Sequence, residues 1–224
     1  MHGIGVTSRY FEPLADVLAS GRRVLVPDLP GWGRSRRPAR ALNLAELADA
    51  LAAFLDAEGV VRAPLVTNSL GCQVAVELAV RHPERVAALV LVGPTVDPQW
   101  RTALLQTRSF VLDSVREPVS LWWIILTDYA RMGPLRFAHT ARFALRQPIE
   151  ELLPRVDAPA LVIRGEHDAF SSQEWCERAA GLLPRGSLAI VDGEAHAAHY
   201  SAPVRVAALV RSFLQEVEEG ADEG

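Results

Sequence analysis

The 224-residue sequence contains no lysine, only two cysteines and no apolar run long enough to cross a membrane. Its longest apolar stretches, such as 86–92 and 121–126, fall far short of the roughly 20 residues that a spanning helix needs. Cys72 and Cys176 allow at most one disulfide, a count typical of the reducing cytoplasm. The first residues show neither the basic nor the apolar region of a secretory signal. We therefore expect a cytoplasmic protein with no membrane segment.

The sequence also has no excess of basic over acidic residues. The 23 basic residues, all arginine, face 27 acidic residues, which gives a net charge of −4, and the acidic surplus gathers in the tail 216–223. Nucleic acid is therefore not expected as a partner. Hydrophobic residues make up 50% and charged residues 22%, a balance that supports a buried core and excludes a disordered or coiled-coil chain. The length favours one domain with an insertion.

Short apolar runs alternate with amphipathic helical patterns, as in a parallel sheet that is covered on both faces. One helix is marked by Asn43 as N-cap, Glu46 three residues later and Gly59 after its end. The predicted strands are 23–27, 64–68, 86–92, 160–164 and 188–191. The predicted helices are 8–20, 44–58, 70–81, 172–183 and 202–218.

The segment 95–155 breaks this alternation, because it has helical patterns and no strand candidate. We interpret it as a helical lid inserted into a core made of 1–94 and 156–224. The lid is rich in aromatic residues, including Trp122 and Trp123. Aromatic residues at helical spacing occur both in cores and in ligand pockets, so both roles stay open at each position.

The strongest chemical signal is the sequence from Leu65 to Gly71, in which an apolar strand runs into a small-x-Ser-x-Gly turn and then a helix. A strand-turn-helix context around a serine predicts a nucleophile elbow, which needs small flanking residues. Gly71 meets that demand, whereas Thr67 stands where glycine is usual. The alternative is that Ser69 only caps the following helix.

Several motifs in order resemble the α/β-hydrolase superfamily over nearly the whole chain. They are His2-Gly3-Ile4-Gly5, the loop 27–35 (PDLPGWGRS), the elbow at Ser69, 81–86 (RHPERV), Gly165-Glu166-His167-Asp168 and Gly193-Glu194-Ala195-His196. The resemblance implies an α/β-hydrolase fold, with a parallel sheet, helices on both faces and a helical lid.

A serine hydroxyl becomes a good nucleophile only with a neighbouring base, which in turn needs an orienting group. The resemblance nominates His196 as the base and Asp168 as the acid, in the chain order of the superfamily. His199 is a rival for the base. Asp97 is a rival for the acid, because some members of the superfamily place theirs after the sixth strand.

The resemblance also assigns an oxyanion hole, whose donors would be the amides of Ile4 and Leu70. It implies hydrolysis through an acyl-serine intermediate. The aromatic lid predicts a largely apolar substrate, most simply a carboxylic ester, with Trp122 and Trp123 as substrate contacts. No cluster has metal-ligand spacing and no glycine-rich loop has phosphate-binding spacing, so neither a metal nor a cofactor is expected.

Two other functions remain open. Asn68 before the nucleophile resembles carbon-carbon hydrolases of aromatic ring-cleavage products, whereas Ala197 stands where those enzymes commonly carry tryptophan. The third possibility is a ligand-binding homologue with slow or no turnover, although the complete Ser, Asp and His set disfavours it.

The resemblance further implies a shortened start, through either a late start codon or a defective fragment. In the superfamily the His-Gly motif follows three strands, but here His2 follows Met1 directly. We therefore expect a gap one strand wide between 23–27 and 64–68, and a poorly anchored Ile4.

Overall fold

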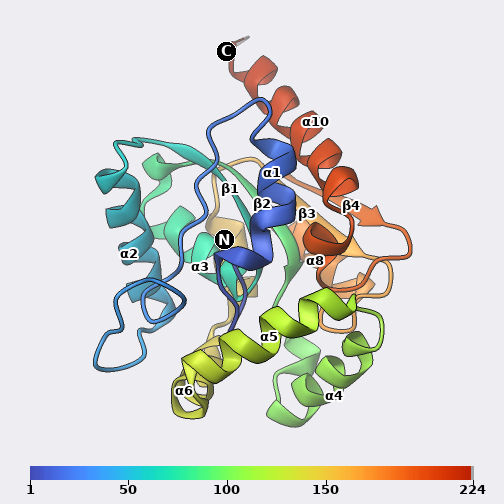
Figure 1. Cartoon of the computed structure of the whole chain (residues 1–224). Helices are drawn as coiled ribbons and strands as arrows, with labels where there is room; N and C mark the ends of the chain where they lie inside the picture. Colours follow the sequence, from blue (N-terminus) through green and yellow to red (C-terminus); the bar gives the residue numbers. More distant parts are fainter. Residues whose placement is uncertain (223–224) are drawn as a thin grey trace.

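Four parallel strands form the centre of the computed structural model, which describes residues 1–222 (Figure 1). They are β1 (Ala63–Ser69), β2 (Val86–Pro94), β3 (Ala160–Gly165) and β4 (Gly186–Val191), and they pair in that order. All four match predicted strands. Because parallel strands all point the same way, their carboxyl ends meet at one edge of the sheet, where ligand-facing residues collect.

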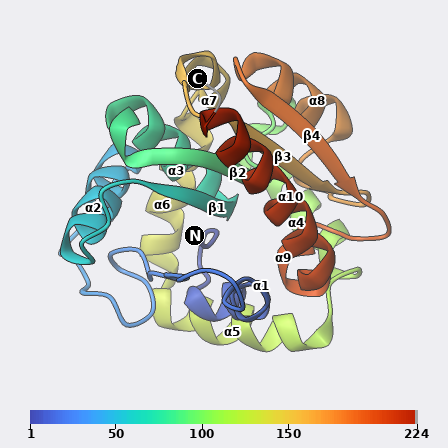
Figure 2. The ribbon, with the colours of Figure 1, turned by 90° about the horizontal axis from the view of Figure 1, so that it is seen from above.

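Helices cover both faces of the sheet (Figure 2). The helices α2 (Leu44–Ala57), α3 (Leu70–Arg81) and α8 (Gln173–Leu182) pack with Leu89 and Leu91 of β2, whereas the intervening Val90 and Val92 pack with the opposite layer. That layer contains the 3₁₀ helix η1 (Ser8–Phe11), α1 (Glu12–Leu18), α9 (Ala198–Ser201) and α10 (Pro203–Asp222). This alternation is the period of two that buries both faces of a strand.

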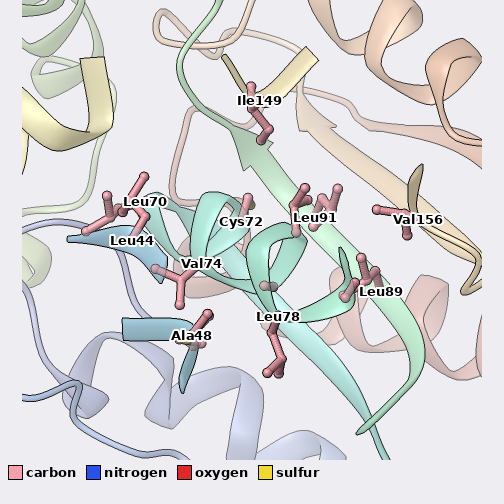
Figure 3. Close-up of a cluster of buried hydrophobic side chains, with 14 of the residues drawn as sticks. Leu44, Ala48, Leu70, Cys72, Val74, Leu78, Leu89, Leu91, Ile149 and Val156 are labelled. Carbon is pink, nitrogen blue, oxygen red and sulfur yellow. The ribbon is translucent and has the colours of Figure 1, made fainter. Parts of the chain in front are cut away.

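The larger of the two cores lies between α2, α3 and β2 (Figure 3). Val74 and Leu78 of α3 are fully buried there, together with Leu89 of β2. Burying an aliphatic side chain of this size stabilises the fold by about 1.5–3 kcal/mol. This packing fixes α3, and therefore the turn that leads into it, against the sheet.

The start and end of α2 follow from local signals. The Asn43 side chain accepts the amide of Glu46, while the Glu46 carboxylate accepts the amide of Asn43, at 2.9 Å in each case. Gly59 follows the helix with a φ of 69°, a conformation that is open to glycine at little cost. The sequence-based prediction of this helix is therefore confirmed.

Residues 95–155 contain only helices. They are η3 (Pro98–Trp100), α4 (Ala103–Ser114), α5 (Val119–Met132), α6 (Pro134–Arg146), α7 (Ile149–Leu152) and η4 (Leu153–Arg155). In Figure 1, α5 runs across the carboxyl-end side of the sheet. The buried Asp128 of α5 accepts the Thr7 hydroxyl at 2.7 Å and also bonds the Arg9 guanidinium, which ties this helix to η1.

The segment 23–27 is not a strand, so that prediction is wrong. It runs extended, but within residues 1–222 no strand lies beside it to complete a hydrogen-bonded ladder. A cavity of about 270 Å³ separates it from β1 and is lined by side chains that include Val26, Val66 and Leu214. A strand makes its ladder hydrogen bonds only with neighbouring strands, and the pattern of one segment cannot report whether a neighbour is present.

The segment around Ile4 is anchored, against expectation. The Met1 amino group donates to the carbonyl of Val66, and the Met1 carbonyl accepts the amide of Asn68 at 3.1 Å. His2 is fully buried, and its Nε2 accepts the amide of Leu29 at 3.0 Å.

No helix within residues 1–222 has the length and hydropathy to cross a bilayer.

Candidate active site

Ser69 lies at the tip of β1, on a sharp turn into α3. Its φ of 56° makes it the one non-glycine residue in the described chain with a positive φ. Such a conformation costs about 1–3 kcal/mol and persists only where the surrounding structure enforces it. A side-chain carbon at Gly71 would lie 2.6 Å from the Met1 carbonyl, so glycine is needed for the first residues to approach the turn.

The two residues before Ser69 are held by hydrogen bonds. The hydroxyl of the fully buried Thr67 donates to the Val90 carbonyl at 3.0 Å, so the β-branched side chain is accommodated within the sheet. The Asn68 side-chain amide donates to the carbonyls of Val92 and His196, both at 3.1 Å. Asn68 therefore links the serine turn directly to the loop that carries His196.

His196 and Asp168 form a buried pair in the loops after β4 and β3. His196 Nδ1 lies 2.9 Å from Oδ2 of Asp168. The other carboxylate oxygen of Asp168 accepts the amides of Phe170 at 2.7 Å and Ser171 at 3.0 Å. The Arg164 guanidinium donates to backbone carbonyls of the same loop, including that of Asp168. The carboxylate is thus fixed in position by its own loop.

The charges around His196 favour its protonated form. Burial lowers its pKa, but the charge and hydrogen bond of Asp168, together with the charges of Asp113 and Glu117, outweigh burial and raise the pKa to about 9. Its ring also contacts Phe170, with 4.6 Å between the ring centroids. The imidazole is therefore restrained on several sides and electrostatically biased toward the imidazolium.

The structure does not bring the rival residues into this arrangement. His199 is fully buried between the rings of Tyr10 and Phe11, each with its centroid 4.3 Å away. Burial lowers the pKa of His199 well below its ordinary value, and its ring nitrogens have no partner among residues 1–222. Asp97 instead caps η3, accepting the Gln99 amide at 2.9 Å and the Ser172 hydroxyl at 2.5 Å.

A cavity of about 390 Å³ connects these groups beneath the lid. Ser69 and His196 both line it, and so do Ile4 and Leu70, the residues expected to supply amide donors. Within the described chain no hydrogen bond joins the Ser69 hydroxyl to the imidazole. Such contacts often tighten only when substrate binds. The remaining lining is largely apolar and comes mostly from lid helices α4, α5 and α6.

The two adjacent tryptophans have different surroundings. Trp122 lines the cavity and packs edge-on against Phe110 of α4, with ring centroids 6.0 Å apart. Trp123 is 69% exposed and does not line the cavity, so the structure does not place it for the expected substrate contact. Successive side chains on a helix point about 100° apart, which explains why one tryptophan faces inward and the other outward.

Two acidic residues of the lid were missed by sequence reasoning. Asp113 Oδ1 accepts the His196 amide at 3.1 Å, and Glu117 Oε1 accepts the Ala197 amide at 2.7 Å. Burial followed by the charge of Asp113 raises the pKa of Glu117 to about 8. The sequence around them mixes apolar and charged residues and gives no signal that these acids are buried. Their burial arises only when the lid docks against a loop about 80 residues later in the chain.

Within the described residues, no group of three or more His, Cys, Asp or Glu side chains could hold a metal ion. The two cysteines are free and buried, and burial raises the pKa of the Cys72 thiol to about 12. A thiol of that pKa is neither a good nucleophile nor a good metal ligand at neutral pH. The side chains of Ser69, His196 and Asp168 offer nucleophilic and acid-base chemistry.

Comparisons with known proteins show what the chain is similar to. Residues 1–121 match the family model described as alpha/beta hydrolase fold, and residues 138–223 match the model described as TAP-like protein. A pimeloyl-acyl-carrier-protein methyl ester esterase of Neisseria meningitidis is 29% identical, over 96% of this chain and 91% of that protein. A 2-hydroxymuconate semialdehyde hydrolase of a Pseudomonas species is 29% identical, over 91% of this chain and 80% of that protein. A thermophilic esterase from Thermogutta terrifontis superposes with a TM-score of 0.78 at 24% identity, over 96% of this chain and 88% of that structure.

Proposed function

Because the chain belongs to the alpha/beta-hydrolase fold family, we propose that it is a serine hydrolase that cleaves a carboxylic ester or a related acyl bond of a largely apolar small molecule. The observation that carries this proposal is the position of Ser69. It lies on a strained turn and lines the same cavity as His196, which is bonded to Asp168 at 2.9 Å. That arrangement has the parts of a nucleophile, a base and an orienting acid.

Each residue has a defined role in the proposed reaction. An ionised carboxylate only accepts hydrogen bonds, so His196 Nδ1–H donates to Asp168 and leaves Nε2 as the acceptor. Nε2 takes the proton of the Ser69 hydroxyl while its oxygen bonds to the substrate carbonyl carbon. The imidazolium then gives that proton to the leaving alcohol as the ester bond breaks, which leaves an acyl-serine.

Hydrolysis of the acyl-serine repeats the sequence with water. His196 removes a proton from water, the resulting hydroxide adds to the acyl carbon, and the proton returns to Ser69 as the acid leaves. Both steps form an oxyanion, and the amides of Ile4 and Leu70 are the proposed donors because both residues line the cavity beside Ser69. Such donors are worth about 2.7–4 kcal/mol each in comparable sites.

Similarity to the ring-cleavage hydrolase supports a second candidate, which is hydrolysis of a carbon-carbon bond. Asn68 before the serine favours it, and Ala197 after the histidine disfavours it. Comparing a neutral ester with a ring-cleavage dienoate as substrates distinguishes the two activities. A third candidate, a ligand-binding homologue with slow turnover, would bind the same compounds without steady hydrolysis.

A fluorophosphonate probe tests the proposed function, because it reacts only with an activated serine. We expect covalent labelling of the wild-type protein and none of Ser69→Ala, with a mass increase on the peptide that contains residue 69. Ser114→Ala is the matched control, since Ser114 also lines the cavity but lies on the lid. Labelling that survives in Ser69→Ala, or a folded wild type that does not label, would disprove the proposal.

The cellular setting is also a proposal. We propose a cytoplasmic enzyme that acts on small molecules, with neither nucleic acid nor membrane as a partner. Two free, buried thiols and a net charge of −4 support this setting. Fractionation of the native host, with the fluorophosphonate label on this protein detected in each fraction, is the measurement that checks it.

A further inference from the structure

The cavity beneath the lid contains acidic groups and no arginine. Apart from two tyrosines, Asp113, Glu117 and His196 are the only ionisable residues that line it, although the chain has 23 arginines elsewhere. When His196 acts as a base it is neutral, so in the reacting state no cation among the lining residues balances the two acids. The cavity is therefore electronegative when the acyl bond is attacked with the lid acids ionised.

Both acids are held in place. The Asp113 carboxylate is fixed by the His196 amide at 3.1 Å, and the Glu117 carboxylate by the Ala197 amide at 2.7 Å. The second oxygen of Glu117 is buried, and the Asp113 side chain lies beside the Glu117 carboxyl group. Neither side chain can turn away from a ligand without giving up its backbone bond.

From this geometry we propose that the cavity accepts uncharged or cationic acyl substrates and rejects those that carry a carboxylate on the acyl chain, with Asp113 and Glu117 as the specificity-determining residues. The inference rests on the proposed function and narrows its substrate class. A ligand carboxylate would displace water from the cavity and face like charges in a medium of reduced dielectric constant, where repulsion is stronger than in water. An uncharged chain meets only the apolar lining.

The same geometry predicts a pH dependence. Groups that face Glu117 are Asp113 of α4, His196 and Tyr10 of η1. Burial and Asp113 raise the pKa of Glu117 to about 8, so it is mostly protonated below that pH and charged above it. Rejection of a carboxylate should therefore increase as the pH rises through about 8.

Three esters of matched length test the proposal. They are p-nitrophenyl hexanoate, the mono-p-nitrophenyl ester of adipic acid, and p-nitrophenyl 6-aminohexanoate, which are neutral, anionic and cationic. For the wild type at pH 9, where Glu117 is mostly ionised, we expect kcat/KM for the adipate ester to be about 100-fold below that for the hexanoate ester, from two like charges at roughly 5 Å. The kcat/KM for the aminohexanoate ester should be at least tenfold higher than that for the adipate ester. Equally low kcat/KM values for both charged esters would mean that the apolar lining alone selects for uncharged substrates, which contradicts the proposal.

The variants Glu117→Gln and Asp113→Asn locate the effect. Each should improve kcat/KM for the adipate ester about tenfold relative to the hexanoate ester, mainly through KM. Glu151→Gln is the matched control, because Glu151 is an exposed acid of α7 outside the cavity. An unchanged adipate-to-hexanoate ratio in both lid variants, or an equal change in Glu151→Gln, would overturn the proposal.

Two further measurements keep the test decisive. If the lid variants do not fold, the wild-type ratio between pH 6.5 and 9.5 replaces them, and a ratio that stays constant contradicts the proposal. Ser69→Ala separates this inference from the proposed function. If Ser69→Ala hydrolyses all three esters as fast as the wild type, the serine mechanism fails. If it hydrolyses none but the wild type treats the three esters alike, only the charge selection fails.

Discussion

Gly93, at the end of β2, lies directly against the imidazole of His196. A side-chain carbon added at Gly93 would lie 2.7 Å from Nδ1 of His196 and 2.8 Å from Oδ2 of Asp168. Gly93 also has a φ of 53°, which disfavours any larger residue. The geometry of the His196–Asp168 pair therefore requires that residue 93 has no side chain.

Gly93→Ala should consequently reduce kcat for a neutral ester by at least about 100-fold, because even a displacement of about 1 Å at reacting groups can cost this much. Gly181→Ala is the matched control, since nothing lies within 4 Å of a side-chain carbon there. It should raise the free energy of unfolding by about 0.5–1 kcal/mol, as alanine does inside a helix. Steady-state kinetics and thermal unfolding check both variants, and normal kcat in Gly93→Ala would contradict the assigned geometry.

The two histidines of the last loop should respond in opposite ways to substitution. His196→Ala should lower kcat by several orders of magnitude with a small change in Tm, because its ring bonds Asp168 beside the cavity. His199→Ala should keep most of kcat but lower the free energy of unfolding by about 2 kcal/mol, because it empties the space between Tyr10 and Phe11. Measuring kcat and Tm for both variants tests this, and a reversed pattern would make His199 the base.

The helices and strands could be predicted from the sequence where the residues that determine them lie within one short segment of the chain. Asn43, Glu46 and Gly59 define the ends of α2 within a single stretch of chain, and the alternation along β2 reports burial on both faces. The segment 23–27 has the composition of a strand but not the neighbour that a strand requires. Local patterns thus indicate which secondary structure a segment can form, while pairing with a neighbouring strand decides whether a strand forms.

The same distinction applies to the site. Ser69, Asp168 and His196 could be nominated because each lies in a short motif that resembles the superfamily, and the structure brings the last two into contact. Asp113 and Glu117 could not, since their importance comes from amides about 80 residues later in the chain. The orientation of Trp122 and Trp123 likewise depends on how α5 is rotated against the core.

The lid acids should also set the pH at which the enzyme works. A general base acts only when neutral, so kcat/KM for the hexanoate ester should rise with pH, with its midpoint near the His196 pKa of about 9. The charges of Asp113 and Glu117 stabilise the imidazolium, so removing either charge lowers that pKa. Glu117→Gln and Asp113→Asn should therefore shift the midpoint to lower pH, whereas Glu151→Gln should not. Profiles between pH 6 and 10 measure the shift, and coincident curves would show that the lid acids do not act on His196.

Trp122 and Trp123 provide a test of which side of α5 faces substrate. Trp122→Ala removes an indole from the cavity wall, so the preferred acyl chain should become longer and KM for the hexanoate ester should rise. Trp123 is 69% exposed, and substitutions at exposed positions usually change the free energy of unfolding by less than about 0.5 kcal/mol. Trp123→Ala should therefore leave both Tm and chain-length preference close to those of the wild type. The measurement is kcat/KM across p-nitrophenyl esters from butyrate to dodecanoate, with Tm for each variant. A shift in chain-length preference for Trp123→Ala, with none for Trp122→Ala, would mean that the lid presents its opposite face to substrate during turnover.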